Sequence, residues 1–313
     1  MKSLIIVLAA SFCLVFWNLE NFYDYIDTQA NTSDTEFSAR GARHWTRKRF
    51  YSKCNAVAKT LYALADREGS LPAVVCFAEI ENAFVLKSLL SATLLRKEEY
   101  LPVHFDSPDP RGIDVALLYD SRVLKLLGAS PHHLYEDGEM LLTRDILVAH
   151  FEIISRGDSL TVIVNHHPSK YSGASSQGKR DVALRQLKDI SDSLYAAGWR
   201  NQVALGDFND TPDNAAFSVL DGSLENLSTD SKFKGKGTIR FNGQWELIDQ
   251  ALIRGGSLQG SEMAILELPF LLQRDNVHPG DKPFRSYSGP RYIGGVSDHL
   301  PIMLRLPFEK ECE

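Results

Sequence analysis

The stretch Gln202–Asp210, QVALGDFND, decides the fold that the sequence predicts. Its first residues form a short apolar run typical of a buried β-strand, and Gly206, Asp207 and Asn209 follow where that strand ends. Taken alone, Gly, Asp and Asn at a strand end are explained by turn formation. The same arrangement recurs elsewhere in the chain, and this recurrence indicates one shared polar site.

Polar blocks stand at the ends of several other predicted strands. They are Trp17–Asn21 (WNLEN), Ala78–Asn82 (AEIEN), Asn165–Lys170 (NHHPSK) and Ser297–Ile302 (SDHLPI). Asp249 differs from them, because it lies inside the otherwise apolar stretch Leu247–Ile253 (LIDQALI). A carboxylate in such a strand carries a large desolvation cost unless it has a partner. The sequence therefore predicts a partner for Asp249.

The order of strands and helices along the chain indicates the fold class. Segments rich in Val, Ile, Leu and Phe predict strands at Cys13–Phe16, Ala73–Phe77, Ile113–Tyr119, Asp145–Ile154, Leu160–Asn165, Gln202–Leu205, Glu246–Ile253 and Pro301–Leu304. Apolar residues at helical spacing predict helices at Trp45–Ala65, Asn82–Leu95 and Lys179–Ala197. Ser155–Ser159 has the features of a hairpin turn. Hairpins mixed with helical connections indicate an α/β protein with mixed sheets, not a doubly wound parallel sheet.

The 313 residues contain no internal repeat and no Pro- or Ser-rich linker, so we expect one domain over residues 12–313. Residues 1–11 show a thin secretory-signal pattern, in which one basic residue precedes a short apolar run and small residues. We therefore expect export to the periplasm or the extracellular space. The alternative is a cytoplasmic protein whose apolar run simply begins the first strand. No apolar run reaches the roughly 20 residues that a membrane-spanning helix needs.

Read in order, the blocks WNLEN, AEIEN, RGIDVALLY, NHHPSK, GDFND, LIDQALI and SDHLPI resemble the endonuclease/exonuclease/phosphatase superfamily. This superfamily includes DNase I, abasic-site endonucleases, neutral sphingomyelinases and inositol-phosphate 5-phosphatases. The resemblance runs from Phe16 to about Ile302, and the stretches Glu36–Arg49 and Lys282–Pro301 resemble an uncharacterised subgroup common in Bacteroidetes bacteria. The resemblance to the superfamily implies a DNase I-like fold, a four-layer sandwich of two packed mixed β-sheets with helices outside.

The resemblance also implies a divalent metal. Carboxylate and amide oxygens are hard ligands suited to Mg²⁺ or Mn²⁺. Glu79 matches the metal ligand of the family, with a helix-capping acid as the alternative. Asn18 would stand beside Glu79 and contact metal or phosphate, and Asp298 would be a second metal-binding or supporting carboxylate.

Three residues would assist the attacking water. His299 matches the general base of the family or, alternatively, an electrostatic stabiliser of the pentacovalent state. Asp249 would bind its other ring nitrogen and fix the tautomer, which would give Asp249 its partner. Asp207 would orient the water.

Two further residues would contact the phosphate. Asn209 would share a face with Asp207 if the segment is extended, so its amide would donate to the phosphoryl oxygen. His166 would contact the phosphate and protonate the leaving oxygen. His167 would point the other way, so we interpret it as structural.

Arg111, Lys170 and Arg180 are candidate phosphate-binding residues, and each could equally be an ordinary surface residue. The net charge of −6 argues against long-lived, nonspecific coating of nucleic acid, which requires a basic surplus. It does not argue against brief, metal-bridged hydrolysis, because a divalent metal would neutralise the acidic residues of the site.

The expected function is a divalent-metal-dependent phosphodiesterase or nuclease. The alternatives are a hydrolase of small-molecule or lipid-linked phosphates and, less in keeping with so complete a set of polar residues, an inactive binding module. The expected partner is the phosphoester substrate, with nucleic acid as one candidate, and no protein partner is predicted.

Overall fold

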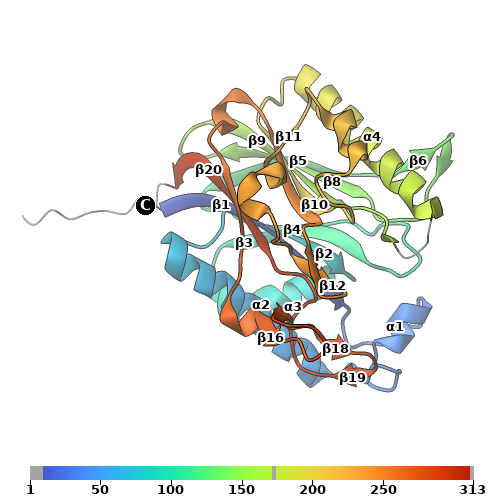
Figure 1. The fold of residues 1–313 in the computed structure, drawn as a ribbon. Coiled ribbons are helices and arrows are strands. Elements are labelled where there is room, and N and C mark those ends of the chain that lie inside the picture. The colour runs from blue at the N-terminus through green and yellow to red at the C-terminus, as the bar shows by residue number, and fades with distance from the viewer. Residues whose placement is uncertain (1–9, 171–173, 311–313) are drawn as a thin grey trace, which may run out of the picture.

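Two six-stranded mixed β-sheets packed face to face form the centre of the protein (Figure 1). The computed structural model describes residues 10–170 and 174–310. The first sheet has the order β15 (Glu262–Ile265), β20 (Ile302–Lys310), β1 (Ala10–Phe22), β2 (Val74–Ile80), β4 (Asp114–Asp120) and β3 (Tyr100–His104). The second has the order β11 (Glu225–Asn226), β14 (Asp249–Arg254), β10 (Gln202–Asp207), β9 (Asp158–His166), β8 (Ile146–Ile153) and β5 (Leu124–His132).

Each sheet contains one parallel pair. β1 runs parallel to β2 and β9 runs parallel to β10, whereas the other neighbouring strands are antiparallel. The predicted hairpin between β8 and β9 is confirmed by their antiparallel pairing. Ligands of open α/β sheets bind outside the carboxyl ends of parallel strands. The polar blocks of the sequence follow those ends.

Helices cover the outer faces of both sheets. The α-helices are α1 (Thr32–Glu36), α2 (Arg47–Glu68), α3 (Ala83–Ala92) and α4 (Ala174–Ala196). α2 and α3 lie against the first sheet and α4 against the second (Figure 1). The Thr46 side chain caps the start of α2, and Gly69, in the left-handed conformation, ends it. These layers confirm the predicted α/β four-layer fold.

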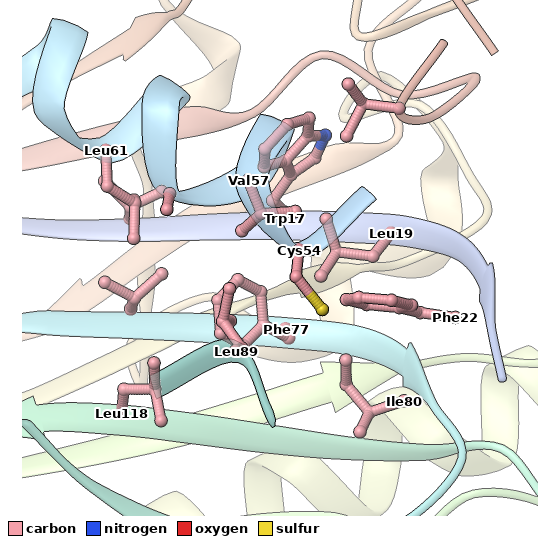
Figure 2. Close-up of a cluster of buried hydrophobic side chains, with 14 of the residues drawn as sticks. Trp17, Leu19, Phe22, Cys54, Val57, Leu61, Phe77, Ile80, Leu89 and Leu118 are labelled. Atoms are coloured by element: carbon pink, nitrogen blue, oxygen red, sulfur yellow. The ribbon is translucent and has the colours of Figure 1, made fainter. Parts of the chain in front are cut away.

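Strand β1 shows how one segment serves two cores. Cys13, Val15, Trp17 and Leu19 pack toward α2 and α3, whereas Phe12, Leu14 and Phe16 pack between the sheets. Side chains alternate between the two faces of a strand, so a strand covered on both faces has an apolar sequence throughout. Figure 2 shows Trp17 and Leu19 against Cys54 and Val57 of α2. This packing of Trp17 and Leu19 fixes the position of Asn18, which lies between them on β1.

Short elements complete the chain outside the two sheets. Two-stranded pairs form between β6 (Tyr135–Glu136) and β7 (Glu139–Met140), β12 (Ile239–Phe241) and β13 (Gln244–Glu246), β16 (Leu272–Arg274) and β17 (Asp281–Pro283), and β18 (Tyr287–Ser288) and β19 (Arg291–Tyr292). The 3₁₀ helices are η1 (Leu94–Lys97), η3 (Ala215–Leu220), η4 (Leu227–Thr229), η5 (Ser231–Phe233), η6 (Gly256–Leu258) and η7 (Pro269–Leu271).

The structure corrects several predicted boundaries. The segment predicted as one strand, Glu246–Ile253, is divided, because Glu246 pairs with β12 and the sheet strand begins only at Asp249. The edge strands β3, β5 and β15 were not predicted, since they are partly exposed and lack a continuous apolar run.

The predicted signal segment falls largely on residues 1–9, outside the described residues, and Ala10 already pairs with Lys310 in the first sheet. Within the described parts of the chain, the helices are too short or too polar to cross a bilayer.

Candidate active site

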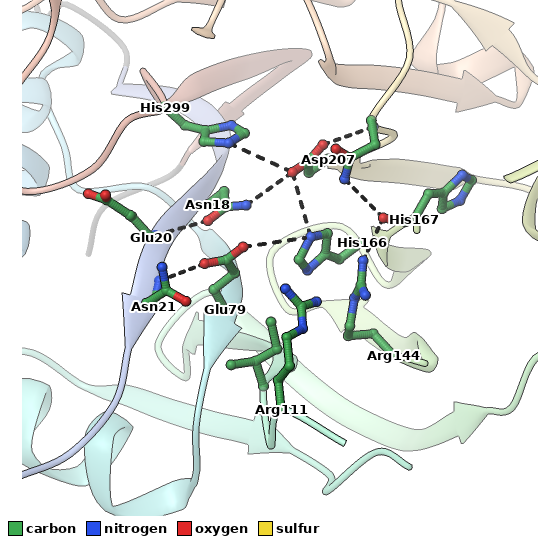
Figure 3. Close-up of polar contacts among 12 residues, drawn as sticks. Asn18, Glu20, Asn21, Glu79, Arg111, Arg144, His166, His167, Asp207 and His299 are labelled. Carbon is green, nitrogen blue, oxygen red and sulfur yellow. Dashed lines mark hydrogen bonds and ion pairs between the residues drawn. The ribbon is translucent and has the colours of Figure 1, made fainter. Parts of the chain in front are cut away.

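The candidate active site lies where the two parallel strand pairs end (Figure 3). β1 carries Asn18, β2 carries Glu79, β9 ends at His166 and β10 ends at Asp207. His166 and Asp207 are register partners on adjacent strands. The fold therefore brings together residues from four of the predicted blocks.

The backbone bends sharply where β1 and β2 reach the site. Glu20, Asn21 and Glu79 have φ angles of 45°, 53° and 62°, and the strand register shifts at the same places. Positive φ is unfavourable for residues with a side chain, and such conformations gather at functional sites. The bend lets the Asn21 backbone N–H donate to Glu79 Oε2 at 2.6 Å, which holds the carboxylate in place.

Asn18 links the two sheets across the site. Its Nδ2 donates to Asp207 Oδ2 at 3.0 Å, and its Oδ1 accepts the backbone N–H of Glu20 at 2.9 Å. In Figure 3 its side chain lies between Asp207 and Glu79. Both Asn18 and Asp207 are buried, so this contact is shielded from water.

His299 is bound to Asp249. Its Nδ1 lies 2.8 Å from Asp249 Oδ2, so Asp249 has the partner that its burial requires. Nε2 of His299 lies 3.9 Å from Asp207 Oδ2. Burial alone would lower the pKa of His299, but the charges of Asp249 and Asp207 outweigh burial and raise it well above its ordinary value. The two carboxylates therefore favour the imidazolium form of His299.

His166 has a pKa shifted in the opposite direction. Its Nε2 lies 3.7 Å from Asp207 Oδ2 and 3.9 Å from Glu79 Oε1. Burial, reinforced by the nearby charge of Arg144, lowers the pKa of His166 well below its ordinary value. Nδ1 has no hydrogen-bond partner among the described residues. His166 is thus a neutral imidazole that faces the same carboxylate as His299.

The segment after Asp207 is not extended. Asn209 has a φ of 51°, and its backbone N–H donates to Asp207 Oδ1 at 2.9 Å, so the expectation that the two side chains share a face of an extended segment is wrong. Asn209 Nδ2 instead donates to the backbone oxygen of His167 at 2.9 Å. The ring of His167 packs edge-on against Phe208, and burial lowers its pKa to about 3, as suits a structural residue.

Asp298 lies in a different group from Glu79. It pairs with Arg285 at 3.1 Å, and Arg285 also binds Glu20 at 2.9 Å. Glu20 is buried, and burial, with the charge of Asp298 as the next cause, raises its pKa to about 7. We did not predict a role for Glu20. Its place in the WNLEN block, two residues after Asn18, was the available signal.

The three predicted phosphate-binding residues lie in different environments. Arg111 is half-exposed, stands beside Glu79 in Figure 3 and is held by Asp109, with 3.3 Å between Arg111 Nε and Asp109 Oδ1. Lys170 is exposed and pairs with Glu246 at 2.8 Å.

Arg180 does not have the exposure expected of a surface phosphate clamp. It is 5% exposed, and its Nε donates to Asp210 Oδ2 at 3.0 Å. This contact anchors the segment that follows Asp207, which is the more direct explanation for a buried guanidinium.

Arg144 supports the site and was not predicted. It is buried, and its Nη1 donates to Asp109 Oδ2 at 3.0 Å while its Nη2 donates to the backbone oxygen of His167 at 2.6 Å. Through these contacts it fixes both the partner of Arg111 and the loop after His166. The sequence offered no clear signal, because Arg144 stands in a charged stretch that is typical of a surface turn.

The donor set fits a divalent cation. Burial raises the pKa of Asp207 to about 7, and a bound cation would relieve the cost of ionising it. Ligand atoms of Asp207, Asp249 and His299 lie within 4.8 Å of one another. However, Asp249 and His299 already satisfy each other, which leaves Glu79, with Asn18 and Asp207 near it, as the residues that could hold a cation.

Solved structures share the fold of this chain at low sequence identity. The mannosyl-6-phosphatase Bt3783 of Bacteroides thetaiotaomicron VPI-5482 is 15% identical with a TM-score of 0.60, over 95% of this chain and 100% of that one. The human Nocturnin catalytic domain is 15% identical with a TM-score of 0.59, over 94% and 92% of the two chains. Truncated Caenorhabditis elegans TDP2 is 14% identical with a TM-score of 0.60, over 95% and 97%. No curated protein matches the sequence.

A family model identifies the family of the chain, which structures at such low sequence identity do not show. The model described as the endonuclease/exonuclease/phosphatase family matches residues 13–307, which include every strand of the site. The members of this family are phosphoester hydrolases. The chain therefore belongs to the endonuclease/exonuclease/phosphatase family.

Proposed function

We propose that the protein hydrolyses phosphoesters with Mg²⁺ or Mn²⁺, by attack of water on phosphorus. One observation carries the proposal: Nε2 of His166 and Nε2 of His299 lie 3.7 Å and 3.9 Å from the same oxygen of buried Asp207, and their surroundings shift the pKa values of the two rings in opposite directions. Two titratable groups of one kind whose pKa values are pushed apart are the usual sign of divided catalytic roles.

Asp207 is suited to orient the water and to accept its proton. Its two oxygens are fixed by Asn18 and by the Asn209 backbone, so the carboxylate is held in one orientation toward the site. The raised pKa of His299 favours the second of its two predicted roles, stabilisation of the negative charge that develops at phosphorus.

His166 and Arg111 would contact the phosphoryl group from the side opposite His299. A neutral His166 can donate one hydrogen bond to a phosphoryl oxygen without repelling the cation at Glu79. Arg111 supplies a positive charge beside Glu79. A divalent metal, when bound, would neutralise the phosphate and stabilise the leaving oxygen, and Glu79 and Asn18 would hold it.

The charge pairing around the site favours a small phosphoester over nucleic acid. Basic side chains around the site contact acids: Asp109 serves both Arg111 and Arg144, and the other pairs are Lys170–Glu246, Arg180–Asp210 and Arg285–Glu20. A nucleic-acid groove needs cations that are available to replace phosphate counterions. We therefore place the small-molecule alternative ahead of the nuclease that the sequence favours.

A substrate panel tests the proposal. The purified protein would be assayed with EDTA, Mg²⁺, Mn²⁺ or Ca²⁺ on p-nitrophenyl phosphate, bis-p-nitrophenyl phosphate, plasmid DNA and RNA, with the Glu79→Gln variant as control. Metal-dependent release of p-nitrophenol is expected. Rapid degradation of DNA or RNA with slow turnover of both small esters would restore the nuclease, and no hydrolysis with any metal would refute the proposal.

A further inference from the structure

A charged pocket adjoins the active site on the side of Glu20. Its volume is about 530 Å³, and Glu20 and Asn21 form the end nearest the site. The backbone N–H of Asn21 binds the Glu79 carboxylate, so the pocket begins next to the residue that would hold the metal. A group attached to a phosphate at Glu79 can therefore extend into it.

Glu36 and Arg43 also line this pocket and form one of its walls. Arg43 Nε donates to Glu36 Oε1 at 2.6 Å, and Arg43 Nη1 donates to the backbone oxygen of Gly289 at 2.8 Å. The Tyr287 hydroxyl donates to the backbone oxygen of Arg43 at 2.9 Å. These contacts hold the wall in one arrangement, so little ordering is needed on binding.

The charges of the pocket argue against a second anion. Arg43 and Arg285 contribute two positive charges, and Glu36 and Glu20 contribute two negative charges. The acids and bases are paired with each other, at 2.6 Å for Arg43 with Glu36 and 2.9 Å for Arg285 with Glu20. A second phosphate or a carboxylate would have to displace one of these acids.

The aromatic residues of the pocket do not offer an open ring face. Phe37 and Tyr287 line it but are only 8% and 5% exposed. The Arg43 guanidinium lies 5.6 Å and 5.5 Å from the centres of these two rings. A nucleobase or a lipid chain needs exposed apolar area, which these buried rings do not supply.

Paired guanidinium and carboxylate groups suit hydroxyl groups. A hydroxyl donates one hydrogen bond and accepts others, so it can bind a carboxylate and a guanidinium placed side by side. Glu36 with Arg43 provides such a pair at a partly exposed position, whereas Glu20 is buried and its two oxygens accept from Arg285 and from the Ser286 backbone. We propose that this pocket binds the polyhydroxylated alcohol of the substrate, the sugar of a sugar phosphate. The proposal rests on the proposed phosphoester hydrolysis and names its substrate class.

Two phosphates of equal carbon number test the pocket. A hexose 6-phosphate and n-hexyl phosphate carry the same phosphate on six carbons, but only the sugar has hydroxyl groups. The p-nitrophenyl diesters of both would be assayed in parallel, so that the comparison holds for a monoesterase or a diesterase. We expect kcat/KM to be about tenfold or more higher for the sugar, the discrimination typical of hydrogen-bonded hydroxyls.

Two variants address the pocket without altering the catalytic residues. Glu36→Gln removes the acceptor charge, and Ala42→Trp fills the pocket, which Ala42 lines. Each should lower kcat/KM about tenfold for the sugar esters and leave the hexyl esters and p-nitrophenyl phosphate within about twofold. Glu136→Gln, an exposed glutamate on β6, is the matched control and should change neither.

The outcomes separate the pocket from the reaction. Equal kcat/KM for sugar and hexyl esters, or variants that slow both classes equally, would overturn the sugar assignment while the hydrolase stands. If no ester in the panel is hydrolysed, the reaction proposal fails, and calorimetric titration with Ca²⁺ and the two phosphates decides the pocket. Tighter binding of the hexose phosphate, weakened by Glu36→Gln, would uphold it, and equal binding would overturn it.

Discussion

The Asp249 carboxylate lies 2.8 Å from Nδ1 of His299, although the two residues are 50 positions apart in the chain. The contact joins the second sheet to the segment that enters the last strand of the first. It fixes the ring so that Nε2 faces Asp207, 3.9 Å away. The charge of His299 and the orientation of its ring therefore both depend on the Asp249 carboxylate.

Asp249→Asn should lower kcat by about a thousandfold or more, with a small change in KM, because it removes both the charge and the tautomer control. The loss of the Asp249 charge should lower the pKa of His299. The alkaline limb of the pH–rate profile should consequently move to lower pH. An unchanged pH profile, or a loss confined to KM, would contradict this role.

Glu79→Gln should abolish metal-dependent turnover while the protein stays folded. The amide keeps the size of the side chain but loses the charge that a divalent cation requires. Circular dichroism should match the wild type, and Mg²⁺ should no longer raise the melting temperature. Wild-type turnover in this variant would remove Glu79 from the site.

Metal should stabilise the protein more strongly as the pH rises. Burial raises the pKa of Asp207 to about 7, above its unfolded value of about 4. Groups shifted in this direction stabilise the fold fully below about pH 4, and that contribution is lost as the pH rises through about 7. Differential scanning fluorimetry should therefore show a larger Mg²⁺-induced rise in melting temperature at pH 8 than at pH 5. An equal rise at both values would argue against carboxylates as the metal-binding groups.

Arg144 and Arg111 should respond differently to the same substitution. Arg144→Met leaves buried acceptors unpaired and should lower the free energy of unfolding by about 3 kcal/mol. Arg111→Met, at a half-exposed position, should cost less than about 1 kcal/mol but raise KM. Urea unfolding and steady-state kinetics on the same preparations would separate the two effects. A stable Arg144→Met variant would show that this arginine does not support the site.

The apolar strands and their polar ends could be predicted because both are local features of the sequence. Gln202–Asp207 forms a buried strand, and its terminal Asp207 meets Asn18 and His166, as the blocks suggested. The buried position of Asp249 required a partner on physical grounds alone, and His299 supplies it. These inferences depend only on strand alternation and on the cost of burying charge.

The remaining features depend on contacts between distant segments. The burial of Arg180 follows from its contact with Asp210, and nothing in the sequence around Arg180 shows that contact. The left-handed backbone of Asn209 is likewise set by the loop of His167, to which its side chain is bound. Sequence patterns indicate which face of a strand or helix a residue occupies, but they do not indicate which residue from a distant segment will contact it.

The antiparallel pairing of β1 with β20 has a consequence for the order in which the enzyme becomes competent. Asn18 leaves the ribosome about 280 residues before His299 and the strand that follows it. At about 5–20 residues per second, the interval is on the order of tens of seconds. During that time a nascent chain has the residues proposed to bind the metal but lacks His299. An enzyme that needs His299 for turnover would therefore gain activity only after β20 has paired with β1.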